Sequence, residues 1–289
     1  MDVFDTPTAM RAWSTGIAAA GRTIGFVPTM GALHTGHLSL VADAAERCDE
    51  VVVSIFVNPL QFNETADFDS YPRPIEDDVE ACREAGVAAV YAPTGAAMYP
   101  PGHQTRVVPG ALADAMEGPG RPGHFEGVLT VVTKLFGAVR PDVAIFGQKD
   151  FQQLRLIQQM SRDLDLGIEI VGHPIVREAD GLAMSSRNVR LTPEQRTAAV
   201  CVPRSLEAAA HAAASRDARL STVLAAAEAT ITDEPLARLE YVTVFDPVDL
   251  SDLSEGSTDE LPTGRALRIA TAVWFGDVRL IDNRELVVG

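Results

Sequence analysis

The 289-residue chain has only three cysteines, Cys48, Cys82 and Cys201, and no two of them share the C-x-x-C spacing of a zinc or redox site. Isolated cysteines of this kind are typical of buried thiols in a reducing compartment. No apolar run approaches the roughly 18–20 residues of a membrane span. Met1–Arg11 carries two acids rather than the apolar core of a signal peptide. We therefore expect a cytoplasmic protein with no membrane partner.

Basic residues are also few, because 24 Lys and Arg stand against 40 Asp and Glu and the formal net charge is −16. An acidic surface repels a phosphate backbone, and no Lys/Arg cluster offsets this repulsion, so we expect no nucleic-acid partner. Residues 201–263 hold 12 Asp and Glu, 4 Arg and no Lys. This stretch indicates a solvated acidic face, with a binding role as the alternative.

Residues 23–171 alternate short β-rich runs with longer helical runs. The run Val51–Val57 is almost continuously apolar, which is typical of a strand covered on both faces. The alternation predicts an α/β fold with a doubly wound, Rossmann-like parallel sheet and right-handed crossovers. The predicted strands are Thr23–Val27, Val51–Val57, Ala88–Tyr91, Val143–Phe146 and Ile168–Val171, and the predicted helices are Leu38–Arg47, Ile75–Glu84, Val128–Val139 and Phe151–Asp163.

The pattern changes after about Val176. Thr192-Pro193-Glu194 predicts the start of a helix, with an N-cap, a proline in the first turn and an acid near the positive end of the helix dipole. We predict one domain of residues 1–175 and a smaller C-terminal α+β domain of residues 176–289. Its predicted elements are the alanine-rich helices Leu206–Ala214 and Val223–Ala229 and the strands Glu240–Phe245 and Ala266–Val273.

The first candidate site is the run Pro28–His37, which leaves the first predicted strand and leads into a helix. Ligands of doubly wound sheets bind at this end of the strands, where helix N-termini point. Gly31 and Gly36 allow a ligand to approach the backbone, and the imidazoles of His34 and His37 can donate to one phosphate chain. The run lacks the G-K-[ST] of a Walker loop. A side-chain metal cluster is not expected, because no third ligand stands nearby.

The second candidate is Met184–Asn188, preceded by Arg177–Gly181. Two hydroxyls and a guanidinium in a glycine-flanked loop suit a clamp on triphosphate oxygens, although the loop alone could be any polar loop. Together with the histidine run, it resembles the H-I-G-H and K-M-S-K-S pair of the nucleotidyl-transferase superfamily. Enzymes of that superfamily direct a carboxylate or a phosphate at the α-phosphate of ATP.

Two more runs follow predicted strands. In Phe146–Gln153, Lys149 offers a compact positive charge for phosphate, and Asp150 suits an N-cap, a ribose contact or a magnesium contact. A capped helix with surface polar residues is the alternative. In Ser54–Asn63, Asn58 and Gln61 are neutral amides able to hold a hydroxy acid, with a simple turn as the alternative for Asn58.

In these and neighbouring runs, the chain resembles the pantothenate synthetase (pantoate–β-alanine ligase) family. The resemblance implies an ATP-dependent ligase that joins pantoate to β-alanine through a pantoyl-adenylate and releases pyrophosphate and AMP. It also implies magnesium carried by the ATP phosphates, with Asp150 as a candidate side-chain contact, and a homodimer. The matching runs are Val27–His37, Ser54–Phe62, Tyr71–Arg73, Gly127–Val132, Phe146–Gln153 and Arg177–Asn188.

The resemblance also assigns roles to individual residues. It implies catalytic roles for His37, His34, Lys149 and Arg187, pantoate binding by Gln61 and Gln153, and β-alanine binding by Gln61. Gln148 departs from the family, in which many relatives carry Glu. The implied ATP-binding residues are Met30, Gly31, Ala32, Leu33, His34, Thr35, Gly36, His37, Gly147, Gln148, Lys149, Asp150, Val176, Met184, Ser185, Ser186 and Arg187.

Three other functions stay open at this point. A nucleotidylyltransferase acting on a phosphate-bearing substrate would need a basic pocket in place of Gln61 and Gln153. A truncated tRNA synthetase would need a basic RNA-binding domain. A nucleotide-sensing module would bind ATP without turnover. The ligase requires that the two imidazoles and the Ser185–Arg187 loop converge on one triphosphate.

Overall fold

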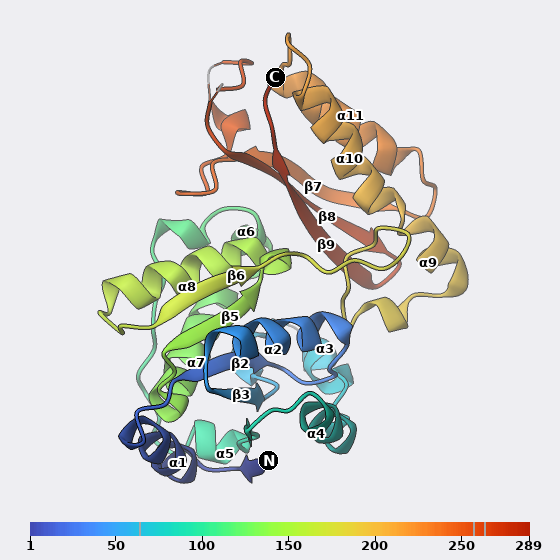
Figure 1. Ribbon diagram of the computed structural model, residues 1–289. Coiled ribbons are helices and arrows are strands. Elements are labelled where there is room, and N and C mark those ends of the chain that lie inside the picture. Colours follow the sequence, from blue (N-terminus) through green and yellow to red (C-terminus); the bar gives the residue numbers. More distant parts are fainter. Residues whose placement is uncertain (64, 257, 263) are drawn as a thin grey trace. The chain divides into compact units, whose positions relative to one another are not determined.

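The computed structural model describes residues 1–63, 65–256, 258–262 and 264–289. They form two compact units, one of residues 1–148 and 152–174 and one of residues 149–151 and 175–289 (Figure 1). Each unit has its own β-sheet. Within the described ranges, no helix combines the length and the hydropathy of a membrane span.

The described part of the first unit contains a six-stranded sheet in the order β1-β4-β3-β2-β5-β6, in which every pairing is parallel. The predicted α/β class with a parallel, doubly wound sheet is therefore confirmed. The predicted strands are present, with their ends shifted by one or two residues. The strands are β1 (Asp2–Phe4), β2 (Ile24–Thr29), β3 (Glu50–Ile55), β4 (Ala89–Tyr91), β5 (Val143–Gly147) and β6 (Glu169–His173).

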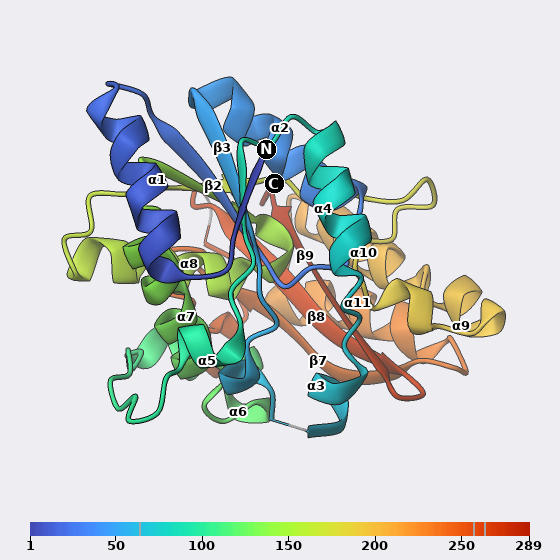
Figure 2. The same cartoon turned by 90° about the horizontal axis from the view of Figure 1, so that it is seen from below.

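Helices cover both faces of this sheet. Successive residues of a strand point to opposite faces, so neighbouring residues of one strand pack against different helices. Phe26 of β2 belongs to a core with residues of α1, α7 and α8, whereas its neighbour Val27 belongs to a core with residues of α2 and α4. Figure 2 shows α1 and α4 on opposite sides of β2 and β3. The helices are α1 (Pro7–Ala19), α2 (Thr35–Arg47), α3 (Thr65–Ser70), α4 (Ile75–Glu84), α5 (Gly95–Met98), α6 (Glu117–Gly120), α7 (His124–Val139) and α8 (Phe151–Asp163), with short 3-10 turns η1 (Pro59–Gln61), η2 (Ala111–Ala113) and η3 (Gln148–Asp150).

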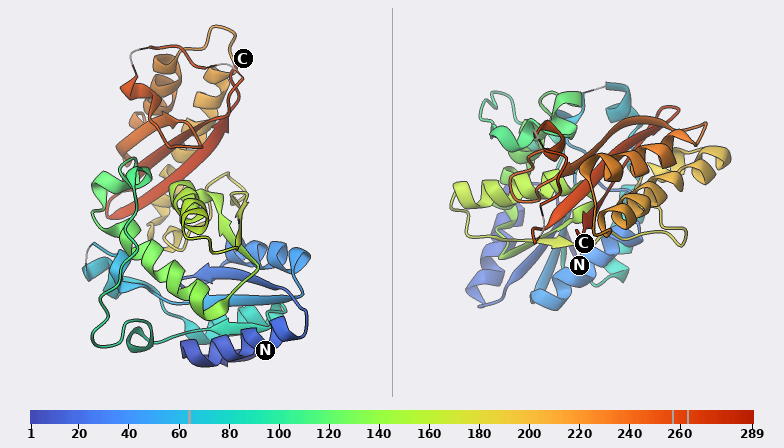
Figure 3. Two further views of the ribbon diagram at one scale, coloured as in Figure 1. Left: turned by 90° about the vertical axis from the view of Figure 1, so that its left-hand side faces the viewer. Right: turned by 90° about the horizontal axis from the view of Figure 1, so that it is seen from above.

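The second unit has, within its described residues, a three-stranded antiparallel sheet in the order β7-β8-β9. Helices α10 and α11 lie side by side along one face of it (orange in Figure 3) and share a core with Val244 and Ile269. The predicted helix start is confirmed, because the Thr192 side chain accepts from Gln195 N at 3.2 Å. The elements are η4 (Asn188–Arg190), α9 (Pro193–Ala198), α10 (Cys201–Ala213), α11 (Leu220–Thr232), β7 (Arg238–Phe245), η5 (Leu253–Glu255), β8 (Leu267–Phe275) and β9 (Val278–Leu286).

Candidate functional site

The order of the parallel strands reverses between β2 and β5. The chain runs from β2 through α2 to β3 on one side, and from β5 through α8 to β6 on the other. In open α/β sheets, ligands bind beyond the carboxyl ends of the strands at such a switch point. The loop after β2 holds the predicted run Met30–His34, and the chain leaves β5 at Gly147 and Gln148. Both predicted nucleotide runs therefore begin at the switch point.

The two histidines form a reciprocal cap at the start of α2. His34 Nδ1 accepts from Gly36 N at 3.1 Å, and His37 Nδ1 accepts from His34 N at 3.3 Å. The ring centroids are 4.1 Å apart. Since each Nδ1 acts as an acceptor, this hydrogen-bond network assigns the proton of each neutral ring to Nε2. The Nε2–H groups are thus the ones suited to donate to an anion at the N-terminus of the helix.

The loop before these histidines is held by a buried carboxylate. Asp78 Oδ2 accepts from Ala32 N at 2.9 Å, and Asp78 Oδ1 accepts from Leu33 N at 2.7 Å. The backbone takes left-handed φ values at Gly31 (84°) and Ala32 (51°). A Cβ at Gly31 would also lie 2.8 Å from Asp78 Oδ2, so this position requires glycine.

Thr29 completes the hold on this loop, since its Oγ1 accepts from Gly31 N at 3.1 Å. The backbone N–H groups of Gly31, Ala32 and Leu33 therefore all donate to side chains of the protein. Any ligand contact at these three predicted residues has to use other atoms.

Gln61, one of the predicted substrate amides, is held in one orientation. Its Oε1 accepts from Asn58 Nδ2 at 3.0 Å, its carbonyl accepts from His124 Nδ1 at 2.8 Å, and its Nε2 donates to Met30 Sδ at 3.1 Å. A thioether is a weak acceptor, so an oxygen of a ligand can replace it at Nε2. The contact also places Gln61 beside Met30 of the first predicted run.

Asn58 supports Gln61 instead of being available to a ligand. Its Nδ2 donates to Gln61 Oε1 and to Gly127 O, and its Oδ1 accepts from Leu60 N and, at 2.8 Å, from Tyr99 Oη. Both donors and both lone pairs of the amide are thereby used. Burial raises the pKa of the Tyr99 hydroxyl, which keeps it protonated as a donor.

Gly127 sets how closely α7 approaches the loop that carries Gln61. A Cβ at Gly127 would lie 2.3 Å from Leu60 O and 2.8 Å from Gln61 N. No side chain fits at that distance, so the glycine of this run serves the packing that positions Gln61.

The first turn of α8 contains two glutamines with different surroundings. Gln152 is buried, and its side chain accepts from Glu117 N at 3.0 Å and donates to Leu112 O and Ala115 O at 2.9 and 2.8 Å. It therefore holds the segment before α7. Gln153, predicted to bind pantoate, is half-buried. Its role stays a prediction.

In the second unit, the predicted serine–arginine loop leaves a small hairpin. Glu178 N donates to Leu182 O at 2.8 Å, and Met184 N donates to Val176 O at 3.0 Å. Leu182 is buried in a core with residues of α9, α10, β8 and β9. Asn188 closes the loop, because its Nδ2 donates to Glu178 Oε1 at 2.7 Å.

Ser185, Ser186 and Arg187 are half-buried residues between these fixed ends. Ser185 Oγ accepts from Arg187 N at 3.2 Å, which gives the segment a compact turn. The hairpin therefore brings Val176 beside Met184, the residue that begins the predicted serine–arginine loop.

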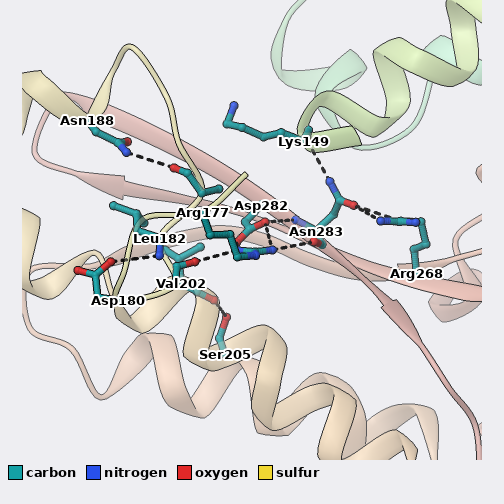
Figure 4. A network of polar contacts seen from close by, with 12 residues as sticks. Lys149, Arg177, Asp180, Leu182, Asn188, Val202, Ser205, Arg268, Asp282 and Asn283 are labelled. Atoms are coloured by element: carbon teal, nitrogen blue, oxygen red, sulfur yellow. Dashed lines mark hydrogen bonds and ion pairs between the residues drawn. The ribbon is translucent and has the colours of Figure 1, made fainter. Parts of the chain in front are cut away.

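Lys149 and Asp150 also belong to the second unit. Lys149 Nζ lies 3.7 Å from Asp150 Oδ2, and Lys149 O accepts from Asn283 Nδ2 at 3.0 Å (Figure 4). In the ranges that the structure describes, no group of three His, Cys, Asp or Glu side chains is arranged to hold a metal ion.

A family model described as pantoate-beta-alanine ligase matches residues 2–285. The chain belongs to the pantoate–β-alanine ligase family. A pantothenate synthetase of Heliobacterium modesticaldum is 49% identical over 288 residues, with 100% of both chains covered.

Two solved structures are also similar to this member of the pantoate–β-alanine ligase family. The crystal structure of pantothenate synthetase from Thermus thermophilus has a TM-score of 0.91 and 43% identity, with 99% of this chain and 100% of that chain covered. A pantoate-beta-alanine ligase of Francisella tularensis, crystallised in complex with beta-gamma ATP and β-alanine, has a TM-score of 0.80 and 33% identity, with 98% and 97% covered. The resemblance stated from the sequence is confirmed.

The departure at Gln148 has a structural explanation in this member of the pantoate–β-alanine ligase family. Its Nε2 donates to Gly172 O of β6 at 3.2 Å. A glutamate at this position could accept but not donate when ionised. Since the side chain serves the sheet, a nucleotide contact at Gln148 is expected to use the backbone.

Sequence reasoning missed three residues that hold the family's motifs in place. Asp78 looks like one of three consecutive acids in the first turn of a helix, a common arrangement with no functional meaning. Asp282 and Asn283 lie in a polar stretch that reads as a loop. No local signal distinguishes them, because their partners, Ala32, Lys149 and Arg177, lie 46 to 134 positions away.

Proposed function

We propose that the protein joins pantoate to β-alanine at the expense of ATP. In the first step a pantoate carboxylate oxygen attacks the α-phosphorus of ATP, an O–P bond forms, and the bond to the β-phosphate breaks, which releases pyrophosphate. In the second step the amine of β-alanine attacks the acyl carbon, the C–N bond forms, and AMP leaves as the amine loses a proton. The family match over residues 2–285 carries this proposal.

We propose that one ATP is held by two sets of donors. The first set is the pair of Nε2–H groups of His34 and His37, which the cap at α2 orients. The second set is Lys149 with Ser185, Ser186 and Arg187. Donors fixed before the reaction stabilise charge that grows on the phosphates, and losing one typically costs about 3–4 kcal/mol, or roughly 100- to 1,000-fold in rate. The remaining predicted ATP contacts complete the nucleotide site.

We propose that Gln61 and Gln153 hold pantoate and that Gln61 also meets β-alanine. An oxygen of pantoate would take Gln61 Nε2 from the weak Met30 sulfur contact. The described hydrogen-bond partners of Gln61 are Asn58, His124 and Met30, none of them Lys or Arg. Such surroundings fit a substrate with one carboxylate better than the phosphate-bearing substrate of a nucleotidylyltransferase.

Magnesium fits this site as a companion of ATP. It commonly binds through one or two carboxylates plus substrate phosphates and keeps several waters. Asp150 is exposed beside Lys149 and offers one carboxylate. Bound there, the ion would neutralise part of the phosphate charge, and the side chains named above would still orient the α-phosphate.

Two further expectations are part of the proposal. Cytoplasmic location is supported by the three free cysteines, which fit a reducing compartment. A homodimer is carried over from the family resemblance. Light scattering of the purified protein tests the dimer, and a monomer at working concentration contradicts it.

A pyrophosphate-release assay tests the function. Release should require pantoate, and pantothenate should form only when β-alanine is added. A nucleotide-sensing module would bind ATP without release, and a nucleotidylyltransferase would release pyrophosphate only with a phosphorylated acceptor. Either result would overturn the proposal.

A further inference from the structure

We propose that Asp282 and Asn283, consecutive residues of β9, are positioning residues, each of which holds one of the two segments that carry the second set of phosphate donors. The proposal rests on the proposed function, because it concerns Lys149 and the Ser185–Arg187 loop of that site. All of the contacts involved lie within the second unit (Figure 4).

Asp282 holds the hairpin that precedes the serine–arginine loop. Its Oδ2 accepts from Arg177 Nη1 at 2.6 Å and its Oδ1 from Arg177 Nη2 at 3.0 Å. Arg177 Nη1 also donates to Gly181 O at 2.9 Å, so one guanidinium links both ends of the turn at residues 177–181 to β9. Met184 is tied to the same hairpin through Val176 O. The base of the loop is therefore fixed to Asp282.

Asn283 holds the segment that carries Lys149. Its Nδ2 donates to Lys149 O at 3.0 Å, and its Oδ1 accepts from Arg268 Nε and Nη2 at 3.1 and 2.9 Å. The guanidinium of Arg268 lies 4.3 Å from the centre of the Phe151 ring. The backbone is therefore held on both sides of Asp150. Asn283 hydrogen-bonds to residue 149, and Arg268 stacks on the ring of residue 151.

The two anchors point to opposite faces of the sheet. Side chains alternate along a strand, and Leu280 and Leu286, which share the parity of Asp282, lie in the cores that include residues of α10. Asp282 therefore points to the helix-covered face, and Asn283 to the other face, with Arg268. One strand fixes the hairpin on one side and the Lys149 segment on the other. A shift of β9 would displace both donor segments together.

The polarity of both anchors goes beyond what the sheet needs. Asp282 and Asn283 are 2% and 3% exposed. Burying a carboxylate is costly, and burial raises the pKa of Asp282 against the opposing effect of Arg177. Replacing a buried ion pair by well-packed apolar residues often leaves stability unchanged or raises it, so stability alone does not require a charged pair here. Placement of the two donor segments is a reason to keep the polar pair.

The test is a pair of near-isosteric variants in the full-length protein. Asn283→Asp keeps the acceptor for Arg268 but removes the donor to Lys149 O. Asp282→Asn keeps the shape but loses the bidentate charge pair with Arg177. We expect each variant to lower kcat/KM for ATP about 10- to 100-fold in pyrophosphate release, because small misplacements of catalytic groups cost that much. KM for β-alanine should stay within about twofold of the wild-type value.

Double-mutant cycles separate positioning from general destabilisation. In a Lys149→Ala background, Asn283→Asp should change kcat/KM for ATP by about twofold or less, since it acts through Lys149. In an Arg187→Ala background, the loss caused by Asp282→Asn should become smaller, since one of the three donors that Asp282 places has been removed. Thr271→Val is the matched control, because Thr271 is fully buried in β8, pairs in register with Asp282, and donates only within the sheet to Tyr241 O at 2.9 Å. It should lower the melting temperature and leave kcat/KM for ATP unchanged.

The proposal would be overturned if the two losses in kcat/KM for ATP multiplied fully in both cycles. It would also be overturned if Thr271→Val lowered kcat/KM for ATP as much as the anchor variants do. If either isosteric variant fails to fold, Arg177→Lys and Arg268→Lys probe the same two anchors more gently, and the same cycles apply. Wild-type protein without pantoate-dependent pyrophosphate release would sink the proposed function instead, so the two failures are distinguishable.

Discussion

Replacing Asp78 by asparagine should detach the loop before α2 without changing the shape of the side chain. In the wild type, two carboxylate oxygens accept from the backbone N–H groups of Ala32 and Leu33 at 2.9 and 2.7 Å. Asparagine has one acceptor oxygen, so its NH2 group would face one of these N–H donors. The other bond would lose the negative charge of its acceptor. The variant therefore removes most of what holds this loop.

The expected size of the effect follows from these bonds. A hydrogen bond to a charged group contributes about 1.5–3 kcal/mol, and leaving a buried N–H without an acceptor costs about 1–3 kcal/mol. The loop also carries the strain of a left-handed backbone at Ala32, roughly 1–2 kcal/mol, which the two bonds offset. A net loss of about 2 kcal/mol in placing the histidines corresponds to about 30-fold in kcat/KM for ATP.

Pyrophosphate release at limiting ATP measures this loss, and thermal unfolding measures the accompanying loss of stability. Asp77→Asn is the matched control, because Asp77 is exposed in the same turn of α4. Adding Ala32→Gly to Asp78→Asn should raise kcat/KM for ATP about fivefold over that of the single variant, since glycine adopts the left-handed backbone without strain. Wild-type kinetics in Asp78→Asn, or no recovery in the double variant, would refute the reasoning.

Three further outcomes are expected. His37→Ala should lower pyrophosphate release about 100- to 1,000-fold and cost about 1 kcal/mol of stability through the lost cap, and release within tenfold of wild type would remove His37 from the mechanism. Gly127→Ala should raise KM for pantoate more than KM for ATP, because the added methyl would lie 2.3 Å from Leu60 O, next to Gln61, the proposed pantoate contact, and unchanged steady-state constants would contradict this. Burial raises the pKa of Cys82 to about 11 and of Cys201 to about 12, so alkylation in the folded state should be slow at pH 8 and fast in urea. Because the unfolded thiols ionise first, near pH 9, stability should fall as pH rises above about 9, and a flat stability profile from pH 9 to 11 would speak against it.

The sheet and its order of elements were predictable because the central strands are apolar on both faces. Val51–Val57 is recognisable without any partner, and Ile75–Glu84 and Phe151–Asp163 carry helical periodicity that the fold leaves intact. The predicted start of α2 at Leu38 was three residues late, since a capping box built from two histidines is not the usual Ser/Thr–Glu pattern. β1 was missed because three residues at the edge of a sheet carry no period. β9 was missed because Asp282, Asn283 and their polar neighbours interrupt its alternation.

The motif residues of the candidate site were predictable because each run follows a predicted strand. What holds them was not. The support of Gln61 comes from Asn58 and from His124, and that of Ala32 from Asp78, through contacts across 3 to 63 positions of chain. Such partners are set by the packing of whole elements, which periodicity does not encode. Convergence of the imidazoles and the serine–arginine loop on one ATP stays a prediction.

Residues 149–151 belong to the second unit although they lie far from its other residues in the sequence, and this affects how the unit folds. A recombinant fragment of residues 175–289 would lack the carbonyl that meets Asn283 and the ring that covers Arg268. Asn283 Nδ2 would then lose its acceptor, and the face of the Arg268 guanidinium that Phe151 covers would be exposed. During translation, those three residues emerge well before the strands they complete. The carboxy-terminal fragment is therefore expected to be less stable than the same residues in the full chain, and in the full chain residues 149–151 can make these contacts only after β8 and β9 have been synthesised.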